Sequence, residues 1–471
     1  MSGLWKSVVE SVRGSRQDFT SGNLNRAVLL LAVPMVLEMA GESLFVLVDA
    51  YFVGRLGSAS LAALGLTETL LAIVYSIGMG LAMATTALVA RRTGEKDERT
   101  AARTAVQAII SALAIAFLIG VPGAIYAPEL LRLMGAEQAV VDVGTTFARI
   151  QLLAGVPVII LLFVNNAIFR GAGDASMAMR SVWLANLLNI PLDYALIFGA
   201  GPFPELGLTG AAVATTTGRA VGVAYQFWHL GRGYRIRITR EDLGFDGRLI
   251  LRLLSVMRGG VGQMLVSHVS YVGSMRMLAA FSEVALAGYT LAIRVVLFVI
   301  FIAWGISNAA AALVGQNLGA EKPDRAERAV WVTGVWNMAY MAVVTVLFVA
   351  LAGPIMEIMA PGPETAAVGR TALTVISLGY VFYAWGMVTF QAFNGAGDTA
   401  TPTRLNILVF WFFQLPLAYV LAFSPQEGVR LPFGMGMGPT GIFLSMTLAY
   451  SLSAVLGVWL FRRGSWKSKK V

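Results

Sequence analysis

Long apolar segments recur along the whole chain, separated by short polar stretches. A helix needs about 20 apolar residues to cross a bilayer. Twelve segments reach that length, near residues 27–52, 60–88, 102–122, 141–165, 178–199, 208–229, 249–274, 284–312, 329–352, 368–392, 404–423 and 439–461. The pattern predicts an all-α, polytopic membrane protein with twelve transmembrane helices, whose loops are too short to hold a soluble domain.

Composition and charge support this interpretation. Hydrophobic residues make up 57% of the chain and charged residues 13%, whereas a soluble domain has roughly 25% charged residues. The net charge is +9, and most Lys and Arg lie in the two tails and in alternate loops. This distribution indicates that both ends are cytoplasmic, and we interpret the charge as a topology signal, with no nucleic acid as partner. The chain has no cysteine, which excludes disulfides, thiolate metal sites and a cysteine nucleophile.

The sequence repeats itself at a nearly constant spacing. ALVARRTG at 87–94 returns as ALVGQNLG at 312–319, and RGAGDA at 170–175 returns as NGAGDT at 394–399. NIPLDYALIFG at 189–199 and GLTG at 207–210 also have counterparts, at 414–424 and 438–441. The polar, basic linker at 229–248 separates the copies. We therefore predict an N-lobe of residues 1–235 and a C-lobe of residues 236–471.

Each copy contains six apolar segments, an even number, so both copies enter the membrane in the same orientation. Parallel repeats related by an axis along the membrane normal are common in secondary transporters, whose substrate sites lie between the halves. An old duplication in a channel or a membrane enzyme is the alternative.

The first apolar segment carries three acidic residues. Glu38, Glu42 and Asp49 share one stripe of the predicted helix, because helical geometry advances about 100° per residue. Ionisable groups at membrane depth are typical of ion pathways and proton relays. Pro34 precedes them and provides a place for the helix to bend. A second interpretation is that Glu38 and Glu42 lie at a water-filled mouth and are simply solvated.

The two copies differ in their acidic residues. Asp49 falls opposite Gly273 or Ser274, and Asp193 falls opposite Ala418, so the carboxylates belong to the first copy only. Polar partners lie in the same half: Asn189 one turn before Asp193, Thr215 in the sixth segment, and Asn165 and Asn166 at the end of the fourth. Carboxylate, amide and hydroxyl oxygens suit sodium or a shared proton and do not suit a soft transition metal.

The second copy offers mainly aromatic, thioether and amide groups. Flat rings and flexible Met side chains suit a large apolar or cationic guest. Most such side chains in an apolar chain are packed or face lipid, so both interpretations stay open for Gln263, Met264, His268, Tyr271, Tyr289, Trp304, Tyr383, Trp385 and Met387. Arg294 lies within the eighth segment, where it can extend to the interface or pair with a carbonyl.

The RGAGD and NGAGD motifs follow long apolar segments and predict tight turns in which the Asp caps the next helix. The chain contains no Gly-x4-Gly-Lys-Ser/Thr motif, so ATP is not the expected energy source.

Nearly the whole chain resembles the multidrug and toxic compound extrusion (MATE) family of transporters. The residues that carry the resemblance are LVDAYFVGRLGSASLAALGL at 47–66, ALVARRTG at 87–94, NNAIFRGAGDA at 165–175, LNIPLD at 188–193 and FNGAGDTATPTR at 393–404. The resemblance implies twelve helices in two six-helix lobes, a cleft between them that opens alternately to either side, and export of organic compounds driven by an inward cation gradient.

The chain is most similar to the DinF-like and archaeal branches, whose coupling site lies in the first lobe. The resemblance implies cation-coupling roles for Asp49, Asn166, Asn189, Asp193 and Thr215, with sodium possible at Asp49, Asn189, Asp193 and Thr215, and a hinge role for Pro34. The sequence departs from other branches at Leu265 and Tyr383, near the positions of their second-lobe acids. It also has Phe45 and Glu42 where the nearest branches tend to have a tyrosine and an amide.

We therefore expect a secondary active antiporter that exports organic, often cationic or amphipathic compounds in exchange for protons or sodium ions. The expected substrate cavity includes Glu42, Phe45, Gln263, Met264, Tyr271, Tyr289 and Tyr383. Two alternatives remain: a lipid-linked precursor flippase, which would call for a strongly cationic cleft, and a membrane enzyme, which would call for clustered His, Asp or Glu. The only two histidines, His229 and His268, are far apart in the sequence.

We expect no cofactor other than the transported ion, small drug-like substrates and membrane lipid as partners, and a monomer. The expected location is the inner (plasma) membrane, with several spans and both termini cytoplasmic.

Overall fold

The computed structural model describes residues 2–15, 17–233, 235–424 and 434–469. Over these residues the chain is helical and contains no strand. The helices of the first half are α1 (Ser2–Arg13), α2 (Leu24–Gly54), α3 (Ser58–Gly94), α4 (Glu98–Ile125), α5 (Ala127–Leu133), α6 (Gln138–Ile150), α7 (Val156–Gly171), α8 (Ala175–Phe198) and α9 (Leu208–Arg232). Those of the second half are α10 (Gly247–Ala279), α11 (Glu283–Gly319), α12 (Pro323–Met359), α13 (Pro363–Ser377), α14 (Tyr380–Gly395), α15 (Ala400–Asn406), α16 (Leu415–Ala422) and α17 (Pro439–Arg462).

Every predicted apolar segment coincides with a helix or with a pair of helices joined by a short break. A π-helical turn at Gln151–Gly155 joins α6 to α7, and another at Ile407–Gln414 joins α15 to α16. Of the helices described, ten are long and apolar enough to cross a membrane, and α13 with α14, bent by 57°, makes up to an eleventh. α9 occupies the sixth predicted position and is more polar. The predicted fold class is confirmed.

Polar side chains at the loop ends fix where several helices start. Asn23 accepts a hydrogen bond from the backbone of Arg26 at 3.2 Å, and Asp97 accepts one from Thr100 at 3.0 Å. Ser282 caps α11 in the same way, at 3.0 Å. Each cap satisfies a backbone N–H that has no partner within its own helix.

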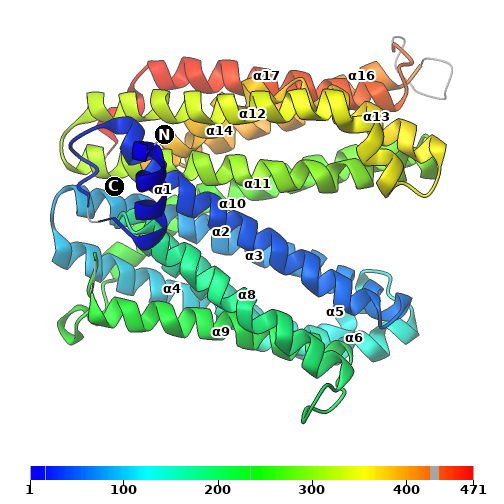
Figure 1. Ribbon diagram of the computed structural model, residues 1–471, viewed down its shortest axis with the longest axis horizontal. Coiled ribbons are helices and arrows are strands. Elements are labelled where there is room, and N and C mark those ends of the chain that lie inside the picture. Colours follow the sequence, from blue (N-terminus) through cyan, green and yellow to red (C-terminus); the bar gives the residue numbers. More distant parts are fainter. Residues whose placement is uncertain (1, 16, 234, 425–433, 470–471) are drawn as a thin grey trace.

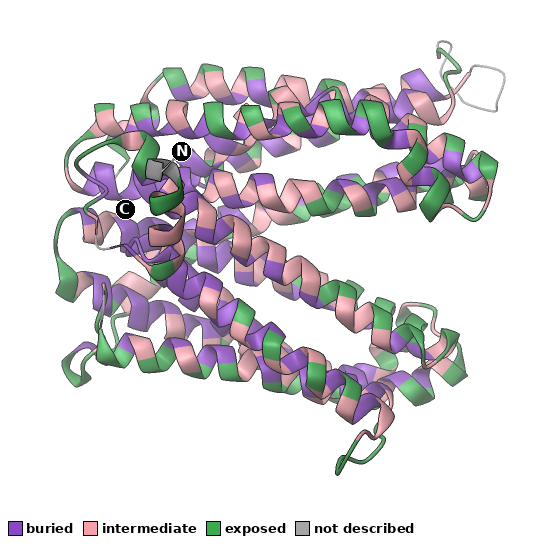
Figure 2. Ribbon diagram, in the orientation of Figure 1, coloured by how far each residue is buried: buried purple, intermediate pink, exposed green. Residues whose placement is uncertain are grey.

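The helices form two groups that converge at the end carrying both termini and diverge toward the other end (Figure 1). α3 packs against α10 and α11, and α2 packs against α11, so the two halves of the chain are in contact. Figure 2 shows that buried residues are concentrated where the groups converge.

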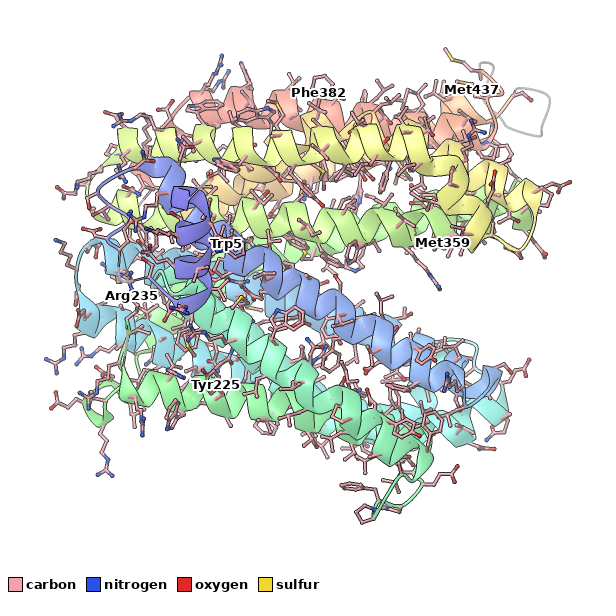
Figure 3. All side chains as sticks on the ribbon, in the orientation of Figure 1. Trp5, Tyr225, Arg235, Met359, Phe382 and Met437 are labelled. Carbon is pink, nitrogen blue, oxygen red and sulfur yellow. The ribbon has the colours of Figure 1, made fainter. Side chains whose placement is uncertain are left out.

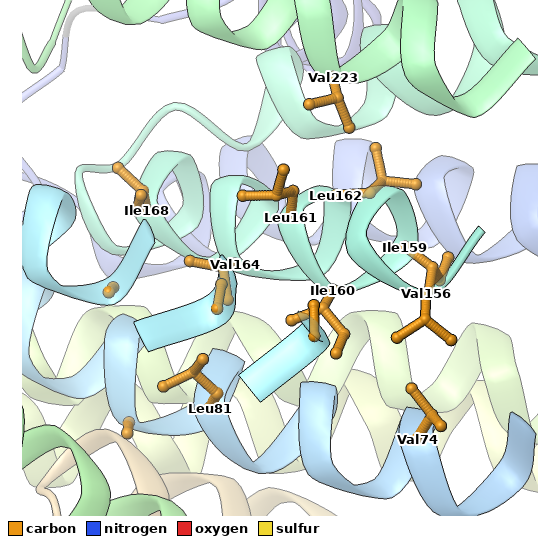
Figure 4. Packing of buried hydrophobic residues seen from close by; sticks show 14 of the residues in the cluster. Val74, Leu81, Val156, Ile159, Ile160, Leu161, Leu162, Val164, Ile168 and Val223 are labelled. Carbon is orange, nitrogen blue, oxygen red and sulfur yellow. The ribbon is translucent and has the colours of Figure 1, made fainter. Parts of the chain in front are cut away.

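Each half has its own hydrophobic core, and a third cluster joins the halves. In the first half, Leu81 of α3 packs with Ile160 and Ile168 of α7 (Figure 4). This core continues into Leu253 of α10 and into Ile236 of the linker. The joining cluster brings residues of α2, including Leu31 and Met35, against Ala309 and Leu313 of α11. The lobe boundary near residue 235 stays a prediction.

The N-terminal segment also contacts both halves at the convergent end. Arg235, beside α1 in Figure 3, donates to the backbone carbonyls of Ser15 and Gln17 at 2.6 and 2.8 Å. Lys322 and Arg325, from the second half, donate to the carbonyls of Thr20 and Ser21 at 2.9 and 2.6 Å. The backbone carbonyls of Ser15, Gln17, Thr20 and Ser21 are therefore held by cationic side chains from the linker and from the C-terminal half.

Candidate cation and substrate site

The predicted acidic pair meets inside the first lobe. Asp49 of α2 accepts a hydrogen bond from Thr215 of α9, with 2.9 Å between Oδ2 and Oγ1. Asp49 also interacts with Asp193 and Asn189 of α8. Spans one, five and six thus converge on one cluster, as the proposed coupling between the two acids requires.

Most of the cluster is buried, with Asp49 half-buried, and several of its polar atoms lack a hydrogen-bond partner. Asp193 and Asn189 are fully buried, and Thr215 is 4% exposed. Among the residues described, both carboxylate oxygens of Asp193, both amide atoms of Asn189 and Oδ1 of Asp49 have no hydrogen-bond partner of good geometry. Buried polar groups are nearly always paired. A bound proton or a cation with oxygen ligands would satisfy the oxygen atoms among them.

Asn166 makes its hydrogen bonds elsewhere in this conformation. Its Nδ2 donates to Glu38 at 2.8 Å, and its Oδ1 accepts from Gln226 at 2.6 Å and from Ser181 at 3.3 Å. These bonds connect α2, α7, α8 and α9. None of the hydrogen bonds of Asn166 in the described structure goes to Asp49, so its predicted role in cation coupling stays a prediction.

Glu38 is not a solvated residue at a mouth. Its side chain is 1% exposed and pairs with Arg170, whose Nη1 lies 3.1 Å from Oε1. The alternative of simple solvation is therefore wrong for Glu38. Glu42 is more open, with a side chain 22% exposed, and its Oε2 lies 3.7 Å from Nη2 of Arg219.

Arg219 is the main site residue that the sequence analysis missed. It lies one helical turn after Thr215 on α9, and its guanidinium carbon is 4.2 Å from the centre of the Phe45 ring. It interacts with Glu42, Asp49 and Tyr75. The spacing of four residues between Thr215 and Arg219 was a usable signal, because positions i and i+4 share a helix face.

A cavity lies between the two halves, beside this network. α2 contributes Glu38, Met39 and Glu42, while the second half contributes Trp304 and Asn308 of α11 and Gln391 and Asn394 of α14. The full lining is Glu38, Met39, Glu42, Met79, Ala82, Met83, Thr86, Phe163, Asn166, Arg170, Trp304, Asn308, Ala311, Gln391 and Asn394. It combines ion pairs and amides with Met and aromatic side chains, which suits an amphipathic guest.

Of the seven residues predicted to form the substrate cavity, one is among its lining residues, and Phe45, Gln263, Met264, Tyr271, Tyr289 and Tyr383 are not. Glu42 lines the cavity, whereas Phe45 is buried beneath Arg219. Gln263 is buried and donates to Asn394 at 2.9 Å. Tyr289 is 1% exposed and stacks on Phe443. These three side chains are packed inside the protein, so they do not line the cavity in this conformation.

The remaining predicted cavity residues of the second half lie in different environments. Tyr383 stacks on Tyr450, with 4.2 Å between ring centres. Tyr271 is 36% exposed. Met264 is half-buried, and its carbonyl lies 2.9 Å from Nδ1 of His268. Within the described part of the chain, no three His, Asp or Glu residues are grouped to hold a metal ion.

Comparison with known proteins identifies the family. The MatE family model matches residues 34–195 and, a second time, residues 261–420. The chain belongs to the MatE family of transporters. The two matches fall on the two copies of the repeat.

This MatE chain is similar along most of its length to bacterial relatives. It is 24% identical to "Probable multidrug resistance protein YoeA" of Bacillus subtilis, covering 95% of each chain. It is 26% identical to "Probable multidrug resistance protein NorM" of Rhodopseudomonas palustris, covering 92% of this chain and 91% of the relative. The fold matches that of a solved MOP superfamily transporter from Pyrococcus furiosus, with a TM-score of 0.87 and 24% identity over 96% of this chain and 98% of that one.

Proposed function

We propose that this MatE transporter exports organic, often cationic or amphipathic compounds in exchange for protons or sodium ions. The observation that carries the proposal is the largely buried cluster of Asp49, Asp193, Asn189 and Thr215. Its unpartnered oxygens lie in the first lobe, which also supplies Glu38 and Glu42 to the wall of the cavity between the lobes. The names of its relatives, which refer to multidrug resistance, support the same cargo class.

In this mechanism a cation reaches the cluster from the side toward which the lobes diverge. It neutralises the Asp49–Asp193 pair and favours a rearrangement of α2 near Pro34 that releases the cargo. One elementary charge crossing 100 mV supplies about 2.3 kcal/mol, to which a concentration gradient adds. The cation has to bind one conformation more tightly than the other, since equal affinity for both shifts no population.

We also propose that the protein lies in the inner (plasma) membrane with both termini in the cytoplasm, acts as a monomer and uses no cofactor besides the transported ion. The cavity wall holds Glu38, Glu42 and one arginine, Arg170, which pairs with Glu38. Glu42 pairs with Arg219, which lies behind the wall. A strongly cationic cleft, which the flippase alternative requires, is not what these pairs form.

The test is uptake of a fluorescent organic cation, ethidium, into proteoliposomes energised either by a pH gradient or by a sodium gradient. Asp49→Asn and Asp193→Asn are each expected to reduce gradient-driven uptake to the level of protein-free vesicles, because an amide neither binds a proton nor carries the charge that attracts a cation. The gradient that drives uptake by the native protein identifies the coupling ion.

Asp142→Asn is the matched control. Asp142 lies on the exposed face of α6 and accepts a hydrogen bond from Gln138 at 2.7 Å. The same chemical change there should leave uptake intact. Full gradient-driven uptake by Asp49→Asn would overturn the mechanism.

A further inference from the structure

Arg219 lies between the cavity and the cluster formed by Asp49, Asp193, Asn189 and Thr215. Its side chain is 11% exposed, and the partner at its cavity side, Glu42, is twice as exposed. On α2, Glu42 and Asp49 are two helical turns apart on one face. On α9, Thr215 holds Asp49, and Arg219 follows one turn later. The guanidinium of Arg219 thus interacts with two carboxylates, those of Glu42 and Asp49.

The guanidinium is not locked onto either carboxylate. Charge-assisted N–H···O bonds are typically about 2.7–2.9 Å long, and the separation between Arg219 and Glu42 is 3.7 Å. Nε of Arg219 is buried and has no hydrogen-bond partner in the described structure. The face of the Phe45 ring supports the cation without competing for its hydrogen bonds.

We propose that Arg219 couples cation binding to cargo binding by being shared between Asp49 and Glu42. This inference rests on the proposed antiport function. While Asp49 is negatively charged, it attracts the guanidinium of Arg219. The negative charge of Glu42 is then only partly neutralised, and Glu42 can bind a cationic cargo. Once a cation occupies Asp49, Arg219 compensates Glu42, and the cargo loses its counter-charge.

The proposal also accounts for two departures noted in the sequence. Glu42 and Phe45 stand where the nearest branches tend to have an amide and a tyrosine, and both side chains contact Arg219. The other groups that face Arg219 are Tyr75, which hydrogen-bonds to it, and Glu68, which interacts with it at longer range. Glu68 also interacts with Asp49 and Arg294, so it belongs to the same network of charges.

A double-mutant cycle tests the coupling. Binding of tetraphenylphosphonium to the purified full-length protein is measured by titration calorimetry for the native protein, Asp49→Asn, Arg219→Gln and the double variant. Asp49→Asn is a permanent mimic of the neutralised carboxylate. We expect it to weaken binding by about 5-fold or more in the native background, the lower end of typical coupling between sites, and to leave affinity within about 2-fold when Arg219 is Gln.

Further variants keep the test decisive. Arg219→Lys retains the positive charge and should retain a weakening by Asp49→Asn, even if Arg219→Gln fails to fold by size-exclusion chromatography. Asp142→Asn should change affinity in neither background. Equal weakening by Asp49→Asn with and without the cation at position 219 would overturn the coupling role. The antiport proposal would survive that result, provided that Asp49→Asn still abolishes uptake in vesicles.

Discussion

At the residue scale, the ion pair between Glu38 and Arg170 shows what a buried charge needs. The Glu38 side chain is 1% exposed and the Arg170 side chain 13% exposed. Two donors, Asn166 Nδ2 and Arg170 Nη1, converge on one carboxylate oxygen of Glu38. Burying a charge is costly unless such partners compensate it.

Arg170→Gln should therefore destabilise the protein by about 3–5 kcal/mol, the usual cost of breaking a buried pair by removing one partner. Adding Glu38→Gln should restore most of that stability, because the uncompensated charge is then gone. Reversible unfolding in mixed detergent micelles measures both. A loss below about 1 kcal/mol, as for an exposed pair, would contradict the role assigned to this contact.

At the element scale, the two repeated motifs meet each other. A Cβ on Gly94, at the end of α3, would collide with the carbonyl of Gln316 on α11, and a Cβ on Gly319, at the end of α11, would collide with the carbonyl of Arg91 on α3. Gly94 and Gly319 are equivalent in the repeat, as are Arg91 and Gln316. The same contact thus occurs twice, as expected for halves related by a two-fold axis.

Gly94→Ala and Gly319→Ala are each expected to destabilise the protein by about 1–3 kcal/mol, since the added methyl group forces α3 and α11 apart. Gly65→Ala in the same helix α3 is the control, because a Cβ there meets nothing within 4 Å. It should be neutral or stabilising by up to about 1 kcal/mol. Melting temperatures in detergent compare the three; identical values would contradict the close approach.

At the scale of the whole molecule, both termini lie at the end where the lobes converge, and the loop between α8 and α9 lies at the opposite end (Figure 1). Arg235, Lys322 and Arg325 hold the backbone carbonyls of Ser15, Gln17, Thr20 and Ser21 there. Separating the two groups of helices at that end would have to break some of these contacts, so the N-terminal segment stabilises their convergence there.

Single cysteines can test the proposed orientation directly, because the chain has none of its own. Phe203, in the α8–α9 loop, is 43% exposed, and Ser468, near the C-terminus, is also exposed. A membrane-impermeant maleimide should label Phe203→Cys in intact cells and Ser468→Cys only after permeabilisation. The reverse pattern would place the termini outside.

The sequence by itself determined the architecture and the location of the acidic groups. The length of an apolar segment is a local property of the sequence, so all twelve segments could be predicted. The repeat was visible as matching residues at a nearly constant spacing. The repeat also showed that Asp49 and Asp193 have no counterparts. That comparison needs no coordinates.

Only the tertiary structure decided which side chains meet. Thr215 and Asp49 are 166 residues apart in the chain, and Asn166 bonds to Glu38 instead of joining them. Arg219 takes its role from Phe45 and Glu42, which lie across a helix interface. Such pairings depend on how helices cross and rotate against each other, and hydropathy and spacing carry no information about that rotation beyond the face on which a residue lies.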